Sequence, residues 1–399
     1  MKDKGHVDRR SFLKQTTKAV AAGSVMTASL AGAESPLDRP PPKKKIKVGV
    51  IGCGRVAWQY LPELARSPFV ELVSTCDIVP QRAKKKASTF KIPNAYSSLD
   101  EMLSGAPIDM VVTLTDIQEH YRLNKQALEA GKHVWSEKPF AATYEQGRQL
   151  SELADRKGVR LLAAPTVIES KQFAYMARTL ASDELGQISN ARARYASSGP
   201  RWSAFFYQKG GGSLFDIGVY KVAMLIGLLG PVREVTGMTR IVTPERVIER
   251  DGTKKTIKVT AEDNTMLVMD HGNGTLSHVQ CGFCYSSPAY AASGIPDYTV
   301  SVVGNKGNMH LAGYAWGPEG VDVSKPGQGK LTRHCAGAQG YSWRQGASNM
   351  AETLVTGREF LVSIEHALHV VEVMAAVKES QRSGRRIKME STFKWPLLV

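Results

Sequence analysis

Cysteine is scarce in this sequence, with five residues among 399, and long apolar runs are absent. So few thiols, odd in number, do not form a disulfide framework, and the chain is long enough for about two domains with cores of their own. The stretch most attractive to a membrane, residues 19–33, contains two glycines and three hydroxyl side chains. It is shorter than the about 20 apolar residues that a spanning helix needs, so we expect no permanent membrane span.

Acidic residues are outnumbered, with 37 Asp and Glu against 52 Lys and Arg, for a net charge of +15. Basic side chains gather at residues 43–45 and 84–86, and we expect both runs to be solvated surface. No nucleic-acid reader motif accompanies them, so nucleic acid is not an expected partner. With 42% hydrophobic and 22% charged residues, the composition is that of a folded globular protein.

Cys281 and Cys284 form a CxxC pair within an alternating, strand-like run. Three-residue spacing on a strand directs the two thiols to opposite faces of the sheet, which favours buried structural thiols. His271 and His278 lie nearby in sequence and leave a metal site open as the alternative. We expect no metal.

The N-terminal segment contains a twin-arginine run, residues 9–14 (RRSFLK), then a mildly apolar region and Ala31-Gly32-Ala33. This pattern resembles a Tat export signal cut after Ala33 and implies the Tat translocon as a partner and a periplasmic or extracytoplasmic location. An ordinary basic N-terminus is the alternative. Cleavage would leave a net charge of +11. Residues 34–45, with three consecutive prolines, predict an extended linker.

From Ile46 to Pro165, apolar runs alternate with helical patterns. This alternation predicts a dinucleotide-binding domain over residues 46–165, built on a doubly wound parallel sheet of the Rossmann type. The expected strands are 46–51, 70–76, 108–114, 132–135 and 160–164, and the expected helices are 56–66, 80–89, 118–130 and 143–157.

After Pro165 the pattern changes to several strands without intervening helices. We expect residues 166–399 to form an α+β domain for substrate binding and oligomerisation, with an open, mostly antiparallel sheet and helices on one face. Asn273-Gly274 marks a hairpin turn. The expected helices are 169–182, 213–229, 345–356 and 360–382, and the expected strands include 187–196, 266–269 and 276–283.

The first predicted strand runs directly into a G-x-G-x-x-A turn. In this pattern Gly52 allows the tight turn, Gly54 lets a diphosphate approach the backbone, and Ala57 lets helix pack on strand. Asp77 ends the next strand, where a carboxylate binds the adenosine ribose hydroxyls and disfavours a 2′-phosphate. NAD is therefore the expected cofactor, and Arg82 leaves NADP possible. The expected contacts of the turn with the dinucleotide are Gly52, Gly54, Arg55, Val56 and Ala57.

Two further motifs carry reactive side chains. Lys138 precedes a proline at the end of the strand in residues 130–139 (AGKHVWSEKP), at the sheet edge where such folds bind ligands. Asp216 and Tyr220 lie four residues apart in residues 210–220 (GGGSLFDIGVY) and share one helical face. A lysine, an aspartate and a tyrosine beside a nicotinamide ring form a proton-transfer site.

Together these three motifs resemble the Gfo/Idh/MocA oxidoreductase family over residues 46–390. Tyr220 is similar to the branch of glucose–fructose oxidoreductase and dimeric dihydrodiol dehydrogenase, in which lysine and tyrosine form the catalytic pair. Residues 115–120 (TDIQEH) match the family's T-P-N-x-x-H pattern at Thr115 and His120 and depart from it at the second and third positions. The resemblance implies that Thr115, His120, Glu137 and Lys138 contact the cofactor.

Oxidation of a carbinol requires a base within about 3 Å of the hydroxyl, and we expect Tyr220 in that role. The ammonium of Lys138 should lower the pKa of this phenol, and Asp216 should orient the substrate hydroxyl or Lys138. A core tyrosine and a structural ion pair are the alternatives.

Aromatic residues shortly before Gly210 could form one wall of a substrate pocket. Among them we predict that Trp202 binds the substrate. Packing between the domains would explain it as well. Weaker candidates are Tyr314, Trp316, Trp343, His366 and His369, the two histidines better explained as an interface pair.

These features predict an exported NAD(P)-dependent oxidoreductase acting on CH–OH groups of a sugar, with a tightly held nicotinamide cofactor. One alternative is a redox-neutral NAD-dependent glycosidase, lyase or epimerase, and another is a non-catalytic carbohydrate-binding protein. The open sheet offers a face for a homo-oligomer, as in relatives of the family.

Overall fold

The computed structural model describes residues 44–250, 252–286, 298–328 and 330–398. The predicted Tat signal and all but the last two residues of the predicted linker lie outside the described residues. Within the described part, no helix has both the length and the apolar composition to cross a membrane.

A six-stranded sheet forms the first domain, with the order β3-β2-β1-β4-β5-β6 and parallel pairing throughout. The two central strands, residues 46–51 and 110–113, are mostly apolar and buried on both faces, as a sheet covered by helices on either side requires. The predicted doubly wound sheet is confirmed. Its strands are β1 (Ile46–Ile51), β2 (Val70–Cys76), β3 (Asn94–Tyr96), β4 (Met110–Thr113), β5 (His133–Ser136) and β6 (Leu161–Ala163).

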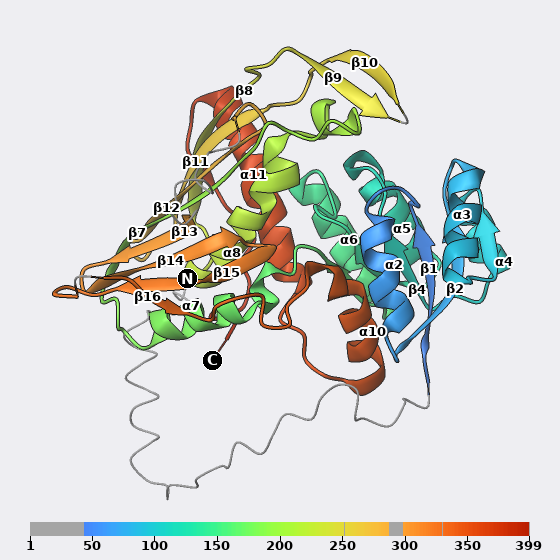
Figure 1. Ribbon diagram of the computed structural model, residues 1–399, viewed down its shortest axis with the longest axis horizontal. Coiled ribbons are helices and arrows are strands. Elements are labelled where there is room, and N and C mark those ends of the chain that lie inside the picture. Colours follow the sequence, from blue (N-terminus) through green and yellow to red (C-terminus); the bar gives the residue numbers. More distant parts are fainter. Residues whose placement is uncertain (1–43, 251, 287–297, 329, 399) are drawn as a thin grey trace, which may run out of the picture. The chain divides into compact units, whose positions relative to one another are not determined.

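The helices of this domain follow the predicted pattern, and Figure 1 shows them on either side of the sheet. Thr143 begins α6 by accepting a hydrogen bond from the amide of Gln146, and Gly158 ends it in the left-handed conformation. The short strand β3 and helix α4 were not predicted. The helices are α2 (Ala57–Arg66), α3 (Pro80–Phe90), α4 (Leu99–Gly105), α5 (His120–Glu129) and α6 (Tyr144–Lys157).

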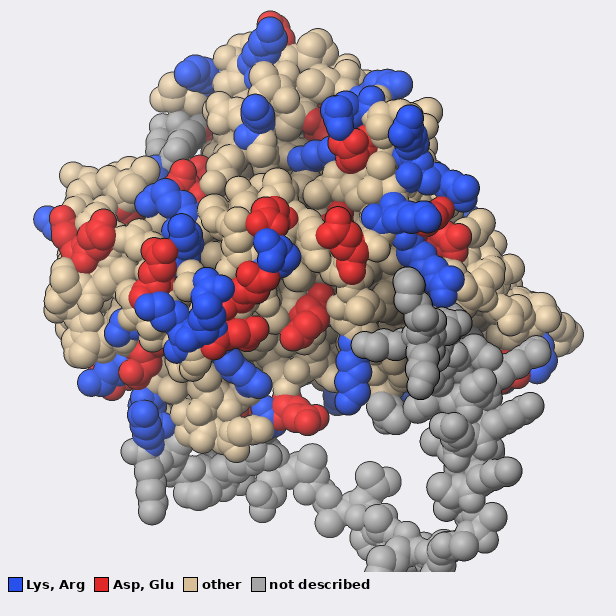
Figure 2. All heavy atoms as spheres, turned by 180° about the vertical axis from the view of Figure 1, so that it is seen from behind, with Lys and Arg blue, Asp and Glu red and all other residues tan. Residues whose placement is uncertain are grey.

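The prediction that residues 84–86 form a solvated basic run is wrong at Lys86. Lys84 and Lys85 are exposed, but Lys86 is buried on α3 with its ammonium 2.9 Å from the ring centroid of Trp58. A cation over an aromatic face is stabilised by the ring quadrupole, which explains how this charge is held. On the face shown in Figure 2, positive side chains are interspersed with negative ones.

A nine-stranded sheet forms the second domain, with the order β16-β15-β14-β13-β7-β12-β11-β8-β17. Every pairing is antiparallel except that of β7 with β12, so the predicted open, mostly antiparallel sheet is confirmed. The predicted hairpin turn at residues 271–274 joins two of its strands. The strands are β7 (Ile188–Ala196), β8 (Glu234–Arg240), β11 (Asn264–Asp270), β12 (Leu276–Gly282), β13 (Tyr298–Gly304), β14 (Gly307–Tyr314), β15 (Gly317–Ser324), β16 (Thr332–His334) and β17 (Ile387–Lys388).

Helices cover one face of this second sheet. Helices α7 (Lys171–Ala181), α8 (Val219–Leu229) and α11 (Ile364–Ser383) pack on it, and their apolar residues form one core with the sheet. Figure 1 shows α8 and α11 between this sheet and the first domain. A separate two-stranded hairpin, β9 (Glu245–Arg250) with β10 (Thr253–Lys258), was not predicted.

Helix α10 (Gly346–Thr356) packs on the first domain, which differs from the predicted division of the chain. The range 166–399 was assigned to the second domain, yet Ala347, Met350 and Ala351 are fully buried in the core of the first sheet. A Cβ on Gly346 would lie 2.2 Å from the ring of Trp135, so the helix begins flush against that strand. The chain therefore returns to the first domain before α11.

The two cysteines of the CxxC pair lie in different surroundings. Cys281 is buried on β12, where its sulfur would be 2.8 Å from a Cβ on Gly218, whereas Cys284 lies beyond the end of the strand and is half-buried. The opposite-face argument therefore does not apply to Cys284. Among the described residues, no group of three His, Cys, Asp or Glu side chains is arranged to hold a metal.

Candidate active site

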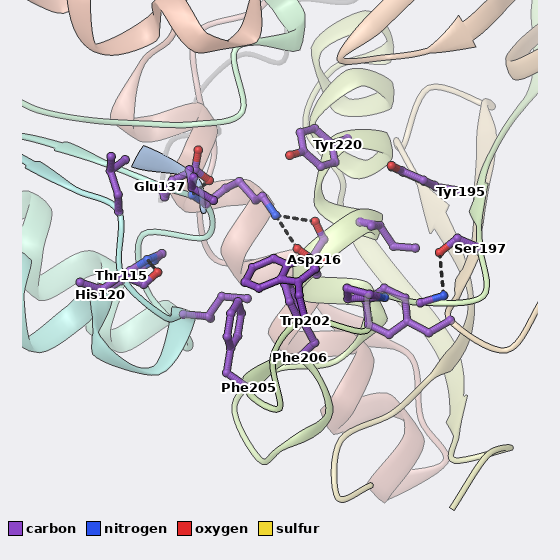
Figure 3. Close-up of a pocket in the computed structure, with 18 of the residues that line it drawn as sticks. Thr115, His120, Glu137, Tyr195, Ser197, Trp202, Phe205, Phe206, Asp216 and Tyr220 are labelled. Carbon is purple, nitrogen blue, oxygen red and sulfur yellow. Dashed lines mark hydrogen bonds and ion pairs between the residues drawn. The ribbon is translucent and has the colours of Figure 1, made fainter. Parts of the chain in front are cut away.

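A cavity of about 410 Å³ lies between the two domains, at the carboxyl edge of the first sheet. The first domain contributes side chains that follow β4 and β5, and the second contributes β7, the loop after it and the start of α8. Of the predicted site residues, the cavity is lined by Val56, Thr115, His120, Glu137, Lys138, Trp202, Asp216 and Tyr220. Figure 3 shows Thr115, His120 and Glu137 of the first domain facing Trp202, Asp216 and Tyr220 of the second.

The two glycines of the turn after β1 serve different purposes. Gly52 has φ +91°, and a Cβ there would lie 2.6 Å from the backbone of Leu114. A Cβ on Gly54 would meet nothing within 4 Å. Gly52 is thus needed for the fold itself, whereas Gly54 leaves free space above the backbone.

Helix α2 begins at the buried Ala57 directly after this turn, and no side chain caps its N-terminus. Uncapped N–H groups at a helix start bind anions, aided by the helix dipole. The free space at Gly54 beside this helix start fits the diphosphate of a dinucleotide. The guanidinium of Arg55 lies 5.8 Å from the ring centroid of Trp202 and links the turn to the opposite wall.

Asp77 is buried at the end of β2, where both carboxylate oxygens accept backbone hydrogen bonds. Oδ2 accepts from the amide of Cys53 and Oδ1 from that of Val79, each at 2.8 Å. The carboxylate thus fixes the glycine-rich turn, and each oxygen retains a lone pair for a ribose hydroxyl. Ile78 beside it is 89% exposed, which leaves an apolar surface next to the ribose position.

Arg82 lies in the first turn of α3, close to Asp116. Partial desolvation raises the pKa of Asp116, and the guanidinium of Arg82 opposes that rise. Asp116 stands where the family pattern has proline. Arg82 thus interacts electrostatically with Asp116 without forming an ion pair among the described residues.

Lys138 and Asp216 join the two domains across the cavity. The Lys138 ammonium donates to Asp216 Oδ1 and to the Asp216 carbonyl oxygen, both at 2.7 Å. Their side chains are 10% and 15% exposed. Burial lowers the pKa of Lys138, but Asp216 and Glu137 outweigh it, so the pKa is raised and the ammonium stays charged. Asp216 therefore holds the Lys138 ammonium in place. Orienting Lys138 was one of the two roles predicted for this carboxylate, the other being to orient the substrate hydroxyl.

Tyr220 lines the cavity beside this pair, with the Lys138 ammonium 5.1 Å from its ring centroid. Its pKa contradicts the predicted depression by Lys138. Burial first, then the carboxylates of Glu137 and Asp216, raise it well above 10. Burial is the largest cause of this rise, and the Lys138 ammonium is paired with Asp216. Among the described residues, the Tyr220 hydroxyl has no hydrogen-bond partner, so it can donate to a molecule bound in the cavity.

The structure contains the helix predicted over residues 213–229, but the geometry of its first turn was not predicted. Leu214–Gly218 form a π-helical turn before α8, and π-turns recur at functional sites. Asp216 projects from this turn and Tyr220 from the first turn of α8. Both still line the cavity.

Glu137 and His120 hold the first-domain wall. Glu137 is buried and accepts a hydrogen bond from the Tyr60 hydroxyl at 2.7 Å. His120 is 1% exposed, and its ring nitrogens lie 2.8 Å from the Pro139 carbonyl and 3.1 Å from the Thr115 carbonyl. Both side chains thus position the loops that contain Thr115 and Lys138.

Trp202 lies on the opposite wall and packs edge-on against Phe206, with ring centroids 4.7 Å apart. It therefore lines the cavity and packs against its own domain, and its role in substrate binding stays a prediction. Trp343, a weaker candidate, also lines the cavity and contacts Tyr60 edge-on at 5.7 Å.

His366 and His369 lie away from the cavity, in the core of the second domain. The His366 imidazole is 3.1 Å from the carbonyl of Ala223, and His369 accepts the amide of Val232 at 2.9 Å. Both are hydrogen-bonded within the second domain, so they are a satisfied buried pair outside the cavity.

Several residues that line the cavity were not predicted, among them Tyr195, which reaches it from the end of β7. Gln118, at a variable position of residues 115–120, donates from the first domain to the carbonyl oxygens of Phe205 and Lys209, at 3.1 and 3.3 Å. Tyr195 belongs to no local motif, and the pattern of residues 115–120 does not indicate the contact of Gln118 with the second domain.

Comparison with known sequences identifies two matches within one family. A model described as the oxidoreductase family with an NAD-binding Rossmann fold (GFO_IDH_MocA) matches residues 46–164. A model of the GFO/IDH/MocA C-terminal domain matches residues 173–310.

Individual relatives are more distant. The scyllo-inositol 2-dehydrogenase (NADP(+)) IolW of Bacillus subtilis (strain 168) is 24% identical over 366 residues, covering 86% of this chain and 96% of the relative. The uncharacterized oxidoreductase ORF334 of Rhizobium meliloti is 29% identical over 181 residues, 45% of this chain and 54% of that protein. The chain thus matches about half the length of ORF334.

Solved structures share the fold. The WlbA dehydrogenase from Bordetella pertussis, in complex with NADH and UDP-GlcNAcA, superposes with a TM-score of 0.70 at 20% identity. The superposition covers 87% of this chain and 99% of WlbA.

Proposed function

Because the chain belongs to the Gfo/Idh/MocA oxidoreductase family, we propose that it interconverts a hydroxyl and a keto group of a sugar or sugar derivative with a nicotinamide cofactor. The observation that carries this proposal is the Lys138–Asp216 ion pair beside Tyr220, in a cavity shared with the glycine-rich turn. NAD is the favoured cofactor, because the Asp77 carboxylate at the end of β2 would repel a 2′-phosphate on the adenosine ribose.

The bound nicotinamide would accept or supply the hydride. The residues of the chain handle the proton. The Tyr220 hydroxyl, protonated because its pKa is raised, donates to the oxygen of a keto sugar and takes the proton back when a carbinol is oxidised. The Lys138 ammonium, held by Asp216, stabilises the negative charge that develops on that oxygen.

We further propose that the protein works outside the cytoplasm after export by the Tat route, as the twin-arginine run in residues 9–14 suggests. Free nicotinamide cofactor is scarce there, so the cofactor would be loaded before export and regenerated within the site. One sugar would then reduce the bound cofactor, and a second sugar would reoxidise it.

The open face of the second sheet suggests a homo-oligomer. Met238 on β8 and Met266 on β11 face each other across the strand pair and are 67% and 54% exposed. Val268 and Leu276, 43% and 49% exposed, extend this apolar surface. Exposed apolar side chains gathered in this way are typical of a protein interface.

The test is to purify the exported protein, measure the cofactor that accompanies it, and follow nicotinamide absorbance and products with sugars and glycosides. Lasting reduction by one sugar, reversed by another, is the expected result. Glycoside cleavage, elimination or epimerisation without net reduction would replace this proposal with the redox-neutral class. Bound sugar without cofactor or turnover would indicate a carbohydrate-binding protein.

A further inference from the structure

A second phenol reaches the cavity, and the chemistry above does not use it. Tyr195, at the end of β7, lines the cavity together with Lys138 and Tyr220. Its ring centroid lies 6.3 Å from that of Tyr220. Figure 3 shows the hydroxyl end of Tyr195 directed toward Tyr220. The two phenols therefore approach the same bound molecule.

The Tyr195 oxygen accepts a hydrogen bond from Trp316. This tryptophan lies in the turn between β14 and β15, and its indole N–H donates to the Tyr195 oxygen at 3.0 Å. The Trp316 ring stacks on Tyr314 with centroids 5.2 Å apart, and Tyr314 lies 5.0 Å from Tyr195. The phenol of Tyr195 is thus fixed by one hydrogen bond and an aromatic cluster.

The direction of the Tyr195 proton follows from this contact. A phenol oxygen that accepts one hydrogen bond still has its own proton to donate. No acceptor for that proton is present among the described residues. Burial, partly offset by Trp316, raises the pKa of Tyr195 to about 12, so the group is a neutral donor at physiological pH.

We propose that Tyr195 donates this hydrogen bond to a second oxygen of the substrate, near the carbon that changes oxidation state, and thereby selects sugars that carry that oxygen. This inference rests on the proposed function and deepens it. A site built to bond a hydroxyl rejects an analogue that lacks it, because the buried partner is then left unsatisfied.

The experiment uses the full-length, cofactor-loaded protein with Tyr195→Phe, Trp316→Phe and the matched control Tyr314→Phe. Tyr314→Phe also removes a phenol hydroxyl from the cluster, but Tyr314 does not line the cavity. The substrates are the hexose or inositol that the wild-type protein turns over fastest and each of its monodeoxy analogues.

The expected result is a loss of about 10- to 100-fold in kcat/KM for Tyr195→Phe with the parent sugar and no loss with one particular deoxy analogue. Trp316→Phe should show a smaller loss of the same pattern, and Tyr314→Phe none. An equal loss on the parent and every analogue, or no loss at all, overturns the proposal.

If the wild-type protein turns over no sugar, the proposed function fails separately. Tyr195 is then judged by calorimetric binding of hexoses, inositols and their monodeoxy analogues to the cofactor-loaded protein, with the sugar that the wild-type protein binds most tightly as the parent. Tyr195→Phe should weaken binding of the parent sugar and leave one deoxy analogue unaffected. The absence of that difference overturns the inference.

Discussion

The two walls of the cavity use different parts of the chain. On the first-domain wall the backbone does most of the positioning, through the free space at Gly54, the uncapped start of α2 and the amides that hold Asp77. On the second-domain wall side chains do so, as the aromatic contacts of Trp202 and Tyr195 show. A site formed by the backbone suits a ligand that is always the same, such as a cofactor. A site formed by side chains can be adapted to different substrates by substitution.

Lys138 is where this division breaks down, since it follows β5 of the first domain but is held by Asp216 of the second. We therefore expect Lys138→Met to have the largest effect on turnover, a loss of about 1000-fold, because both the positive charge and the link between the walls disappear. Steady-state kinetics, with cofactor content measured in parallel, gives the result. Lys125→Met, at an exposed helix position, is the control. A kcat within threefold of wild type would remove Lys138 from the chemistry.

Low pH should destabilise the second domain, because this domain contains buried histidines. Burial lowers the pKa of His366 from 6.5 to about 4. As the pH falls, the unfolded chain therefore binds the proton before the folded chain does. Stability present above about pH 6.5 is lost as the pH falls towards 4, with a contribution of about 3 kcal/mol from this group.

His366 contacts the carbonyl of Ala223 in α8, the helix that carries Tyr220. Tm measured between about pH 7 and pH 4 should fall less steeply in His366→Gln, which has no imidazole to titrate. An identical pH slope in the variant would show that the acid sensitivity arises elsewhere.

Tyr220→Phe probes the second wall alone, and we expect a loss of about 100-fold in kcat with unchanged cofactor affinity. Because the pKa of Tyr220 is raised well above 10, the phenol remains protonated at neutral pH. Reduction of a keto sugar by the wild-type protein should therefore be independent of pH between about pH 6 and pH 9, since the acid form is lost only above the pKa. A fall in the rate within that range would contradict the raised pKa.

The backbone wall was predictable from the sequence and the side-chain wall only in part. The turn from Gly52 to Ala57 and Asp77 lie within one βαβ unit, where spacing along the chain determines spacing in space. Lys138, Asp216 and Tyr220 were found because each lies in a local motif. Their protonation could not be predicted in the same way, because the pKa of Tyr220 depends first on how deeply the folded protein buries the phenol.

Long-range contacts explain the remaining differences. Tyr195 and Trp316 are 121 residues apart, and nothing near either residue marks the contact. Helix α10 reads as a continuation of the second domain, because only the tertiary fold shows Ala347 and Met350 in the first core. Amphipathic pattern predicts that a helix is buried but does not identify the sheet it packs on.

Gly54→Ala tests the backbone wall with the smallest change. Its new methyl group would meet nothing within 4 Å, so the protein should fold as before, while the space for a diphosphate is reduced. We expect the Kd for NAD, measured by fluorescence titration, to rise about tenfold. Gly52→Ala is the comparison, because its Cβ would lie 2.6 Å from the Leu114 backbone at φ +91° and should lower Tm instead. Unchanged NAD affinity in Gly54→Ala would mean that the diphosphate does not approach the turn at this residue, and the distinction between the two walls would then fail at the position where it is sharpest.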